Sequence, residues 1–289
     1  MLKAVVIAQL SLDEILASAR SLPSAPRVFA RINAAMANPN TSIYEVADLV
    51  KVDPSLSASL LQVANSSLYR RGEEVDSIDQ AINRVGLREL HRLVALAMAQ
   101  QMAVGGLPAY GVSAERLWEN SVMVALALAG LAKAAGQDER QAYTIGLLRS
   151  IGFALFQVLV RKRDLPELTT AERTPRGREE WELRHFGTTA PEVSEKLLRA
   201  WEFPREIAAA VGAQYRPDRS SGASRWAALL HLAVGQTEVL SREMPFEKGS
   251  WRKGPTIIGL AGLQGIDPAT LIPALHEQYV SVRAALNGP

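Results

Sequence analysis

The chain has 289 residues, of which 48% are hydrophobic and 21% are charged; these fractions are ordinary for a globular protein and exclude a disordered or collagen-like chain. Lys and Arg number 32 against 30 Asp and Glu, giving a net charge of +2, so composition carries no electrostatic footprint for nucleic acid or a membrane surface. Cysteine is absent, which excludes disulfides, thiolate zinc sites and a cysteine nucleophile and agrees with a reducing cytoplasm.

Two apolar stretches bear on a membrane location. The longest, Val122–Ala132, has eleven residues, whereas a helix needs about 20 to cross a bilayer, so we interpret it as part of a buried core helix. The N-terminal sequence MLKAVVIAQLSLDE has one lysine and no small-residue cleavage site before its first acids, and it does not match a signal peptide. We therefore expect a cytoplasmic protein without a membrane partner.

Apolar residues recur with a helical period along the chain, and strand-like alternation is nearly absent. Segments rich in Ala and Leu add helix propensity, and Gly86 and Gly136 fit helix C-termini. Residues suited to helix N-caps stand, in chain order, at Asn40, Thr41 or Ser42, at Asp53 before Pro54, at Ser77 with Gln80, at Ser113 and at Asp138. We predict an all-α fold, with only the first ten residues ambiguous between helix and strand.

The second half of the chain contains the longer predicted helices. One continuous helix is predicted to follow Asp138, from Glu139 to Lys162. The charged segment 161–178 predicts an exposed connection in its second half, and the turn-rich segment 217–224 predicts a boundary. Beyond that boundary the sequence WAALLHLAV is too apolar to stand exposed, so the C-terminal helices are predicted to pack on the preceding lobe.

Some polar and aromatic residues stand among apolar helix positions. Asn65, in the sequence VANS, is predicted to bond to the backbone and to pin the junction of two helices, because a buried amide needs hydrogen-bond partners. Large aromatic side chains at such positions are usually core anchors. We interpret four tryptophans in this way: Trp118, Trp181, Trp201 and Trp226.

Several motifs occur in a fixed order. GLLRSIG (146–152) resembles GLLHDIG, WENS (118–121) resembles WxxS, and DPSLSASLLQVANSSLY (53–69) resembles DPxLxxxLLxxANSxxY. The chain also carries LPSAP (22–26), SIDQAINRVGLREL (77–90) and HFGTTAPEVSEKLLRAWEFP (185–204). Together these motifs resemble the HDOD family, a bacterial signalling domain related to the HD metal phosphohydrolases.

The resemblance covers residues 22–217 and implies a two-lobed helical domain. It implies a first lobe at 22–108 and a degenerate HD-like lobe at 109–217. A segment at 1–21 precedes this domain, and a helical extension at 218–289 follows it. We expect that extension to pack on the HD-like lobe.

The same resemblance identifies the positions that bind metal in HD enzymes, where imidazoles and carboxylates lend lone pairs to divalent cations. In this chain those positions carry Asn120, Arg149, Ser150, Ala190, Gln214 and Tyr215, and Val234 replaces an aspartate. An arginine cannot ligate a metal and repels one. We therefore expect a non-catalytic protein with no metal and no other cofactor.

The remaining residues offer no other catalytic centre. The P-loop, the G-x-S-x-G elbow and the G-x-G-x-x-G fingerprint are absent from the sequence. None of the histidines has the short spacing of a metal motif, so we interpret each as a surface or hydrogen-bonded core residue. They are His91, His185, His231 and His276.

Arg149 leaves two alternatives open. It is either paired with a nearby acid, or it binds a small anion or a nucleotide without turnover, since a guanidinium holds phosphate with two parallel hydrogen bonds. The second alternative predicts a concave pocket lined by Arg149, Asn120 and Gln214. The first is favoured.

Arg84, Arg88 and Arg92 recur every fourth residue, with His91 beside them, and this spacing predicts one helix face. The face is either a basic stripe for an acidic partner or phosphate, or a solvated face balanced by acids such as Glu89; the balanced net charge favours the second. The stretch lacks a clear recognition helix, so nucleic acid is not an expected partner.

The resemblance also implies a role in bacterial signal transduction, in motility, stress responses or networks linked to cyclic-di-GMP. The sequence contains no recognisable receiver, GGDEF or kinase segment. We therefore expect the chain to act as an interaction module through a signalling protein that the sequence does not identify. A residual phosphohydrolase and a DNA-binding regulator are the less favoured alternatives.

Overall fold

The computed structural model describes residues 10–22, 25–38, 40–66, 69, 72–219, 224–251 and 253–287. Over these residues the regular structure is helical, and the β structure there is limited to an isolated bridge between Leu107 and Val112. The predicted all-α fold class is confirmed.

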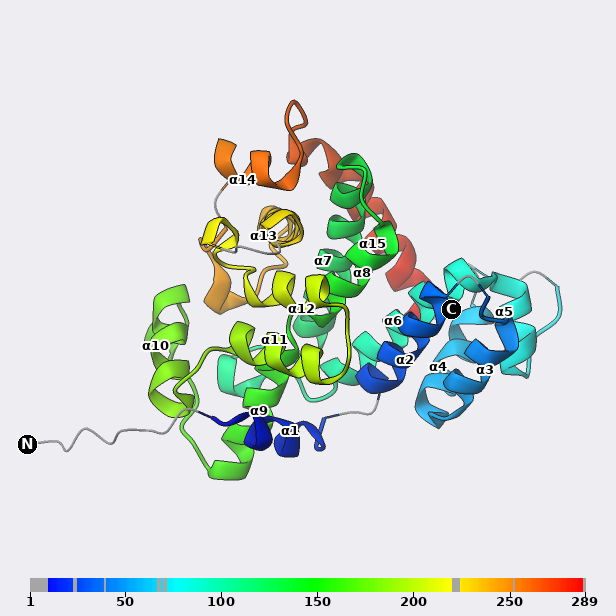
Figure 1. Ribbon diagram of the computed structural model, residues 1–289, viewed down its shortest axis with the longest axis horizontal. Coiled ribbons are helices and arrows are strands. Elements are labelled where there is room, and N and C mark those ends of the chain that lie inside the picture. The colour runs from blue at the N-terminus through cyan, green and yellow to red at the C-terminus, as the bar shows by residue number, and fades with distance from the viewer. Residues whose placement is uncertain are drawn as a thin grey trace, which may run out of the picture.

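The first lobe lies at the right of Figure 1 and is built on a core that includes the buried Phe29, Ile32, Leu56 and Leu60. Its helices pack mainly on their neighbours in the chain and on α6. They are α2 (Ala25–Ala37), α3 (Ile43–Lys51), α4 (Pro54–Ala64), α5 (Ile78–Val85) and α6 (Leu87–Ala103).

Local signals read from the sequence start and stop these helices. Gly86 ends α5 with φ of 80°, a conformation that glycine adopts without strain. The amide of Asn65 donates to the Val75 carbonyl oxygen at 2.8 Å and accepts from the Val75 N–H at 2.9 Å, which confirms that Asn65 ties the end of α4 to the segment before α5. The N-cap side chains that accept a backbone N–H are those of Ser42, Asp53, Ser77, Ser113 and Asp138.

The second lobe surrounds α7 (Ala114–Ala134), whose stretch 122–132 is mostly buried as predicted. Helix α6 packs on α2, α4 and α5 of the first lobe and on α7 and α8 of the second, so it joins the two lobes. The other helices of this lobe are α8 (Glu139–Leu148), α9 (Ile151–Arg163), α10 (Pro175–Phe186), α11 (Ala190–Ala200) and α12 (Arg205–Gly212).

The continuous helix predicted after Asp138 is wrong, because a turn at Arg149 and Ser150 separates α8 from α9. The glycines on either side of the turn pack against different helices. A Cβ at Gly146 would lie 2.5 Å from Ala125 Cα of α7, and one at Gly152 would lie 2.0 Å from the Ala190 carbonyl oxygen of α11. The turn lets both close contacts form at once.

The tryptophans divide into two groups. Trp181 and Trp226 are buried, as expected for core anchors, whereas Trp118 and Trp201 are half-buried and pack on the edge of the core. All four tryptophans therefore contact the core, as predicted, but only Trp181 and Trp226 are buried in it.

The first described helix and the C-terminal helices pack onto the same body. Helix α1 (Leu12–Ala19) contacts α9 and α11, and α13 (Ser224–Val239) contacts α7, α8, α12 and α14 (Pro255–Ala261). Helix α15 (Ile272–Asn287) follows α7 and reaches α4 of the first lobe (Figure 1). The C-terminal helices therefore contact chiefly the second lobe, and the predicted boundary at 217–224 includes residues 220–223, which lie outside the described residues.

One helical run in the described part of the chain is long and apolar enough to cross a membrane by length and composition. It is Glu139–Arg163, and its 18-residue window has a mean hydropathy of 1.6. Within the fold 89% of that window is buried, and the turn at 149–150 interrupts it. The run therefore serves as the core element α8–α9.

Candidate functional site

The residues at the former HD positions come from separate elements. Asn120 lies in the middle of α7, Arg149 lies directly after α8, and Gln214 and Tyr215 follow α12. A residue that the sequence reading did not select, Glu247, joins them from the short 3-10 helix η4 (Pro245–Glu247) of the C-terminal segment. The side chains of Asn120, Arg149, Gln214 and Glu247 are all fully buried.

Arg149 is the centre of this group. Its Nη1 donates to Glu247 Oε1 at 2.9 Å and to Gln214 Oε1 at 3.0 Å. Its Nη2 donates to Glu247 Oε2 at 2.7 Å and to Asn120 Oδ1 at 2.6 Å. The four Nη hydrogens of a guanidinium are thus all bonded, and the carboxylate is held in the two-point geometry that makes such pairs strong.

The two amides are oriented by further bonds. The Asn120 NH2 group donates to the Arg242 carbonyl oxygen at 2.9 Å, and the Gln214 NH2 group donates to the Val211 carbonyl oxygen at 3.0 Å. Each amide oxygen is therefore turned toward Arg149. The backbone oxygen of Gln214 is in turn 2.9 Å from His231 Nδ1, so His231 is a hydrogen-bonded core residue, as predicted.

Aromatic rings enclose the ion pair. The Tyr215 hydroxyl donates to Glu247 Oε1, and the Tyr215 ring stacks on Trp251 with centroids 5.0 Å apart. Burial and the charge of Glu247 raise the pKa of Tyr215 well above its usual range, so the hydroxyl keeps its proton. Burial alone lowers the pKa of Arg149, but the charge of Glu247 outweighs it and the pKa is raised, so the guanidinium stays charged.

A second buried ion pair lies beside the first. Arg178 Nη1 donates to Glu182 Oε2 at 2.8 Å, and the guanidinium lies 4.7 Å from the centroid of the Tyr215 ring. Glu182 also accepts the Ala190 N–H at 2.9 Å and the Tyr110 hydroxyl at 3.2 Å. Burial raises the pKa of Glu182 above its usual range, although the charge of Arg178 and the donors Ala190 N–H and Tyr110 oppose that shift.

The predicted exposed connection is confirmed in part: residues 170–177 are exposed or half-buried, but α10 begins at Pro175 and its Arg178 is an exception. The residue lies inside α10 and is only 4% exposed. The prediction was based on the charged residues and prolines of this segment. In the structure Glu182, one turn later, neutralises the charge of Arg178, and the rings of Tyr215 and Phe153 cover its guanidinium. The Tyr215 ring packs on Arg178 and its hydroxyl donates to Glu247, the partner of Arg149, so the two ion pairs form one buried network.

These residues do not fit a divalent metal ion. Arg149 fixes a positive charge at the centre, and the oxygens of Glu247, Asn120 and Gln214 that face it are already bonded to its hydrogens. Among the residues that the structure describes, no group of three His, Asp or Glu side chains is arranged to hold a metal. A phosphate could bind both Nη atoms of Arg149 only by displacing Glu247, which is bonded to each of them.

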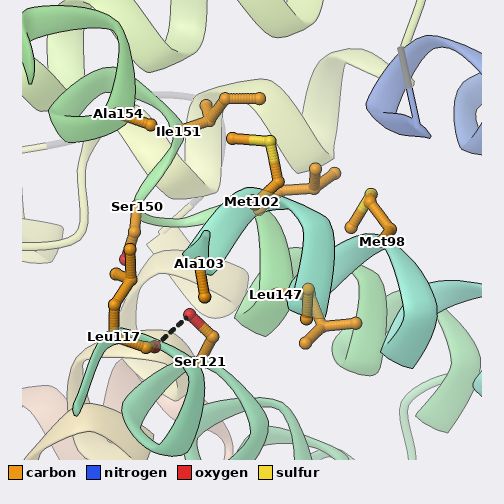
Figure 2. A pocket seen from close by; sticks show the side chains of 11 residues that line it. Met98, Met102, Ala103, Leu117, Ser121, Leu147, Ser150, Ile151 and Ala154 are labelled. Carbon is orange, nitrogen blue, oxygen red and sulfur yellow. Dashed lines mark hydrogen bonds between the residues drawn. The ribbon is translucent and has the colours of Figure 1, made fainter. Parts of the chain in front are cut away.

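Three of the former positions lie outside this network of side chains. Ser150 faces a separate hollow beside α6 (Figure 2). Ala190 takes part through its backbone N–H, which bonds Glu182, and Val234 is fully buried in α13. Only Asn120, Arg149, Gln214 and Tyr215 of the predicted set are brought together.

The proposed basic stripe is not a single helix face. The break at Gly86 puts Arg84 on α5 and Arg92 on α6. Arg84 donates to a backbone carbonyl oxygen, and Arg92 lies 3.8 Å from Glu89, the acid that the sequence suggested as its balance. The side chain of Arg88 lies outside the described residues.

His91 is buried, so it does not contribute to a basic surface stripe. It is 1% exposed, and its Nε2 lies 3.1 Å from Asn33 Oδ1 of α2 and 3.4 Å from Thr144 Oγ1 of α8. Burial, aided by the charge of Arg140, lowers the pKa of His91 to about 4. The residue is a neutral core histidine where the two lobes meet.

The sequence reading also missed Glu119, the neighbour of Asn120 in WENS. This buried carboxylate accepts the Tyr279 hydroxyl at 2.6 Å and Arg283 Nη1 at 3.2 Å, both from α15, and Arg242 Nη1 lies 3.5 Å away. Glu119 and Asn120 therefore hold the C-terminal segment by adjacent side chains. The available signal was an acid beside apolar residues on a predicted core helix.

The comparisons with known proteins agree with this fold. The model of the HDOD domain matches residues 22–217. An uncharacterized protein of Treponema pallidum (strain Nichols) is 24% identical over 193 residues, which cover 64% of this chain and 36% of that protein. The matched part thus spans about a third of that relative's length.

Solved structures cover almost the whole chain. A protein of Shewanella amazonensis SB2B, provisionally named a phosphohydrolase, is 25% identical with a TM-score of 0.65 and covers 94% of this chain and 97% of its own. An HDOD domain protein from Geobacter sulfurreducens is 22% identical with a TM-score of 0.66, covering 96% and 98%. A protein of Marinobacter aquaeolei VT8, provisionally named a signal transduction protein, is 22% identical with a TM-score of 0.69, covering 97% and 61%.

Proposed function

The chain belongs to the HDOD family, and from this premise we propose that it is a regulatory signal-transduction protein that acts without catalysis, by contact with a partner protein. The observation that carries the proposal is that all four Nη hydrogens of Arg149 are bonded, which leaves only its buried Nε–H without a partner among the described residues. A guanidinium whose four Nη hydrogens bond to Glu247, Gln214 and Asn120 neither binds a metal nor activates a water molecule.

The C-terminal segment supports the same reading. It contributes Glu247, which is bonded to Arg149 and to Tyr215, and the backbone oxygen of Arg242, which is bonded to Asn120. HD enzymes take a cation from solution, whereas here a built-in cation and a built-in carboxylate neutralise each other. The former site then acts as a lock that fastens the C-terminal segment to the HD-like lobe.

The pathway is the finer part of the proposal. Family membership favours a cytoplasmic role in motility, stress responses or cyclic-di-GMP-linked signalling, exerted through a signalling protein of unidentified sequence. The likeness to the Marinobacter protein named for signal transduction is consistent with regulation. The sensor alternative, in which Arg149 binds a nucleotide or another anion, is disfavoured because Glu247 already bonds both Nη atoms of the guanidinium.

Metal analysis and a phosphodiesterase assay test the absence of catalysis. We expect less than stoichiometric Mn, Fe, Zn and Mg in the purified protein and no hydrolysis of bis-p-nitrophenyl phosphate or cyclic-di-GMP when each metal is added. Bound metal at one or more ions per chain, with turnover that Glu182→Gln abolishes and the surface change Glu179→Gln leaves intact, would overturn the proposal.

Capture of partners from native cells tests the regulatory role. We expect wild-type protein, purified with its C-terminal helices intact, to retain a signalling protein that direct binding with purified components then reproduces. Failure of every captured protein to bind directly would contradict a role exerted by protein contact.

A further inference from the structure

Ser150 occupies a different environment from Arg149, although the two residues are adjacent. Its side chain lines a hollow formed by α6, α7, α8 and α9 (Figure 2). The hollow has a volume of about 350 Å³ with its open mouth included. Because α6 belongs to the first lobe and the other helices to the second, the hollow lies at the joint between them.

The chemistry of the lining selects the charge of an occupant. Methionine, leucine, isoleucine and alanine side chains make up the lining apart from two serines, and no charged side chain contributes. An ionised molecule would lose its hydration here without gaining a partner of opposite charge. The hollow therefore suits an uncharged and mostly apolar molecule.

The two serines differ in their hydrogen bonds. Ser121 Oγ donates to the Leu117 carbonyl oxygen at 2.8 Å, so this hydroxyl is satisfied. Ser150 is only 6% exposed, and its Oγ has no hydrogen-bond partner among the described residues. A buried hydroxyl without a partner is uncommon and points to a bound water or ligand.

Two methionines govern the size of the occupant. As the side chains stand, the enclosed part holds about one water molecule. Met98 is buried and Met102 is half-buried, and both line the hollow (Figure 2). Methionine is unbranched and has three rotatable side-chain bonds, so an occupant larger than a water molecule requires a change of rotamer at Met102, the more exposed of the two.

We propose that this hollow is a binding site for a small uncharged molecule of about the size of one aromatic ring, carrying a hydroxyl that bonds Ser150 Oγ. An occupant contacts α6 on one side and α7–α9 on the other, and so ties the two lobes together. The site is separate from the Arg149 network, and its existence does not depend on the proposed function.

Phenol and toluene test the site, because they match in shape and differ in one hydroxyl. We expect the methyl resonances of Met98 and Met102, in protein labelled with [methyl-13C]methionine, to shift saturably with each compound. The methyl groups of Met36, Met123 and Met244 lie outside the hollow and serve as internal controls. Absence of saturable shifts at Met98 and Met102, or equal shifts at all five, would overturn the proposal.

Two matched variants test the role assigned to the hydroxyl. Ser150→Ala should weaken phenol binding about fivefold, the worth of one neutral hydrogen bond, and leave toluene binding unchanged. Ser121→Ala removes a hydroxyl from the same lining that is already satisfied, so it should leave the ratio of the two affinities unchanged. A phenol affinity that Ser150→Ala does not alter, or that Ser121→Ala lowers equally, would overturn the assignment.

Discussion

The molecule holds two buried polar centres that are satisfied in opposite ways. Around Arg149 the charge is retained, and each Nη hydrogen meets an acceptor. His91, by contrast, is uncharged. Burial keeps its ring neutral, and its Nδ1 has no partner among the described residues. The comparison teaches that burial, aided by a nearby charge, leaves a weak base neutral, whereas a buried guanidinium stays charged and is stabilised by acceptors at its Nη atoms, even though the Nε–H of Arg149 has no partner among the described residues.

Removal of the Glu247 charge should disrupt the Arg149 network and cause the largest loss of stability among these variants. Glu247→Gln leaves the buried guanidinium without a counter-charge, and we expect a loss of about 3–5 kcal/mol in the free energy of unfolding, measured by urea denaturation. Glu179→Gln is the matched control, since Glu179 pairs with Arg216 on the surface and should cost under about 1 kcal/mol. Equal losses in the two variants would contradict the lock.

Acid should destabilise the folded protein through His91. The pKa of His91 is about 4 in the folded chain, against about 6.5 for an unperturbed histidine, so below pH 6.5 the unfolded chain binds a proton that the folded chain does not. Stability should therefore fall as the pH drops from about 6.5 to 4, by up to about 3 kcal/mol. The measure is the difference between wild type and His91→Gln in urea denaturation across that range, and a constant difference would refute it.

Loss of the uncharged hydrogen bonds between Asn65 and the Val75 backbone should reduce stability less than loss of Glu247, and so tests how much the charge matters. Asn65→Ala removes two bonds to Val75, one to its carbonyl oxygen and one from its N–H, in a partly buried place. We expect a loss of about 1–2 kcal/mol, with no dependence on salt concentration, because neither partner is charged. A loss that shrinks in 1 M salt would mean that charge contributes there.

Replacement of the whole ion pair should have the smallest effect. Arg149→Met combined with Glu247→Leu removes both charges together, and well-packed apolar substitutes for a buried pair are often neutral or stabilising. We expect the double variant to lie within about 1.5 kcal/mol of wild type, far above Glu247→Gln alone. A double variant as unstable as the single one would show that the amides and Tyr215 depend on the charges.

The local signals of the fold could be predicted from the sequence. Ser42, Asp53 and Ser113 cap helices where the sequence has cap residues before apolar runs, because the bonds involved span two or three positions. The clamp made by Asn65 is also local. Such features depend on short-range geometry, which is why the helix starts and the fold class were predictable.

The centre of the candidate site was only half predictable. Motif order identified Asn120 and Arg149, but Glu247 lies 98 residues beyond Arg149 in the chain, in the short 3-10 helix η4. The burial of Arg178 and His91 likewise depends on rings and amides supplied by distant helices. Hydrophobic periodicity does not encode which long-range partner neutralises a buried charge.

The glycines of GLLRSIG have a consequence for how such chains are recognised. A side chain at position 152 would strike the Ala190 carbonyl oxygen and one at 146 would strike the backbone of α7, so packing alone restrains both letters of the motif. Helix packing thus accounts for both glycines of the motif without any reference to the chemistry of the residues between them. A search for the glycines and apolar residues of the motif therefore detects shared ancestry, and only positions 149 and 150 carry information on activity.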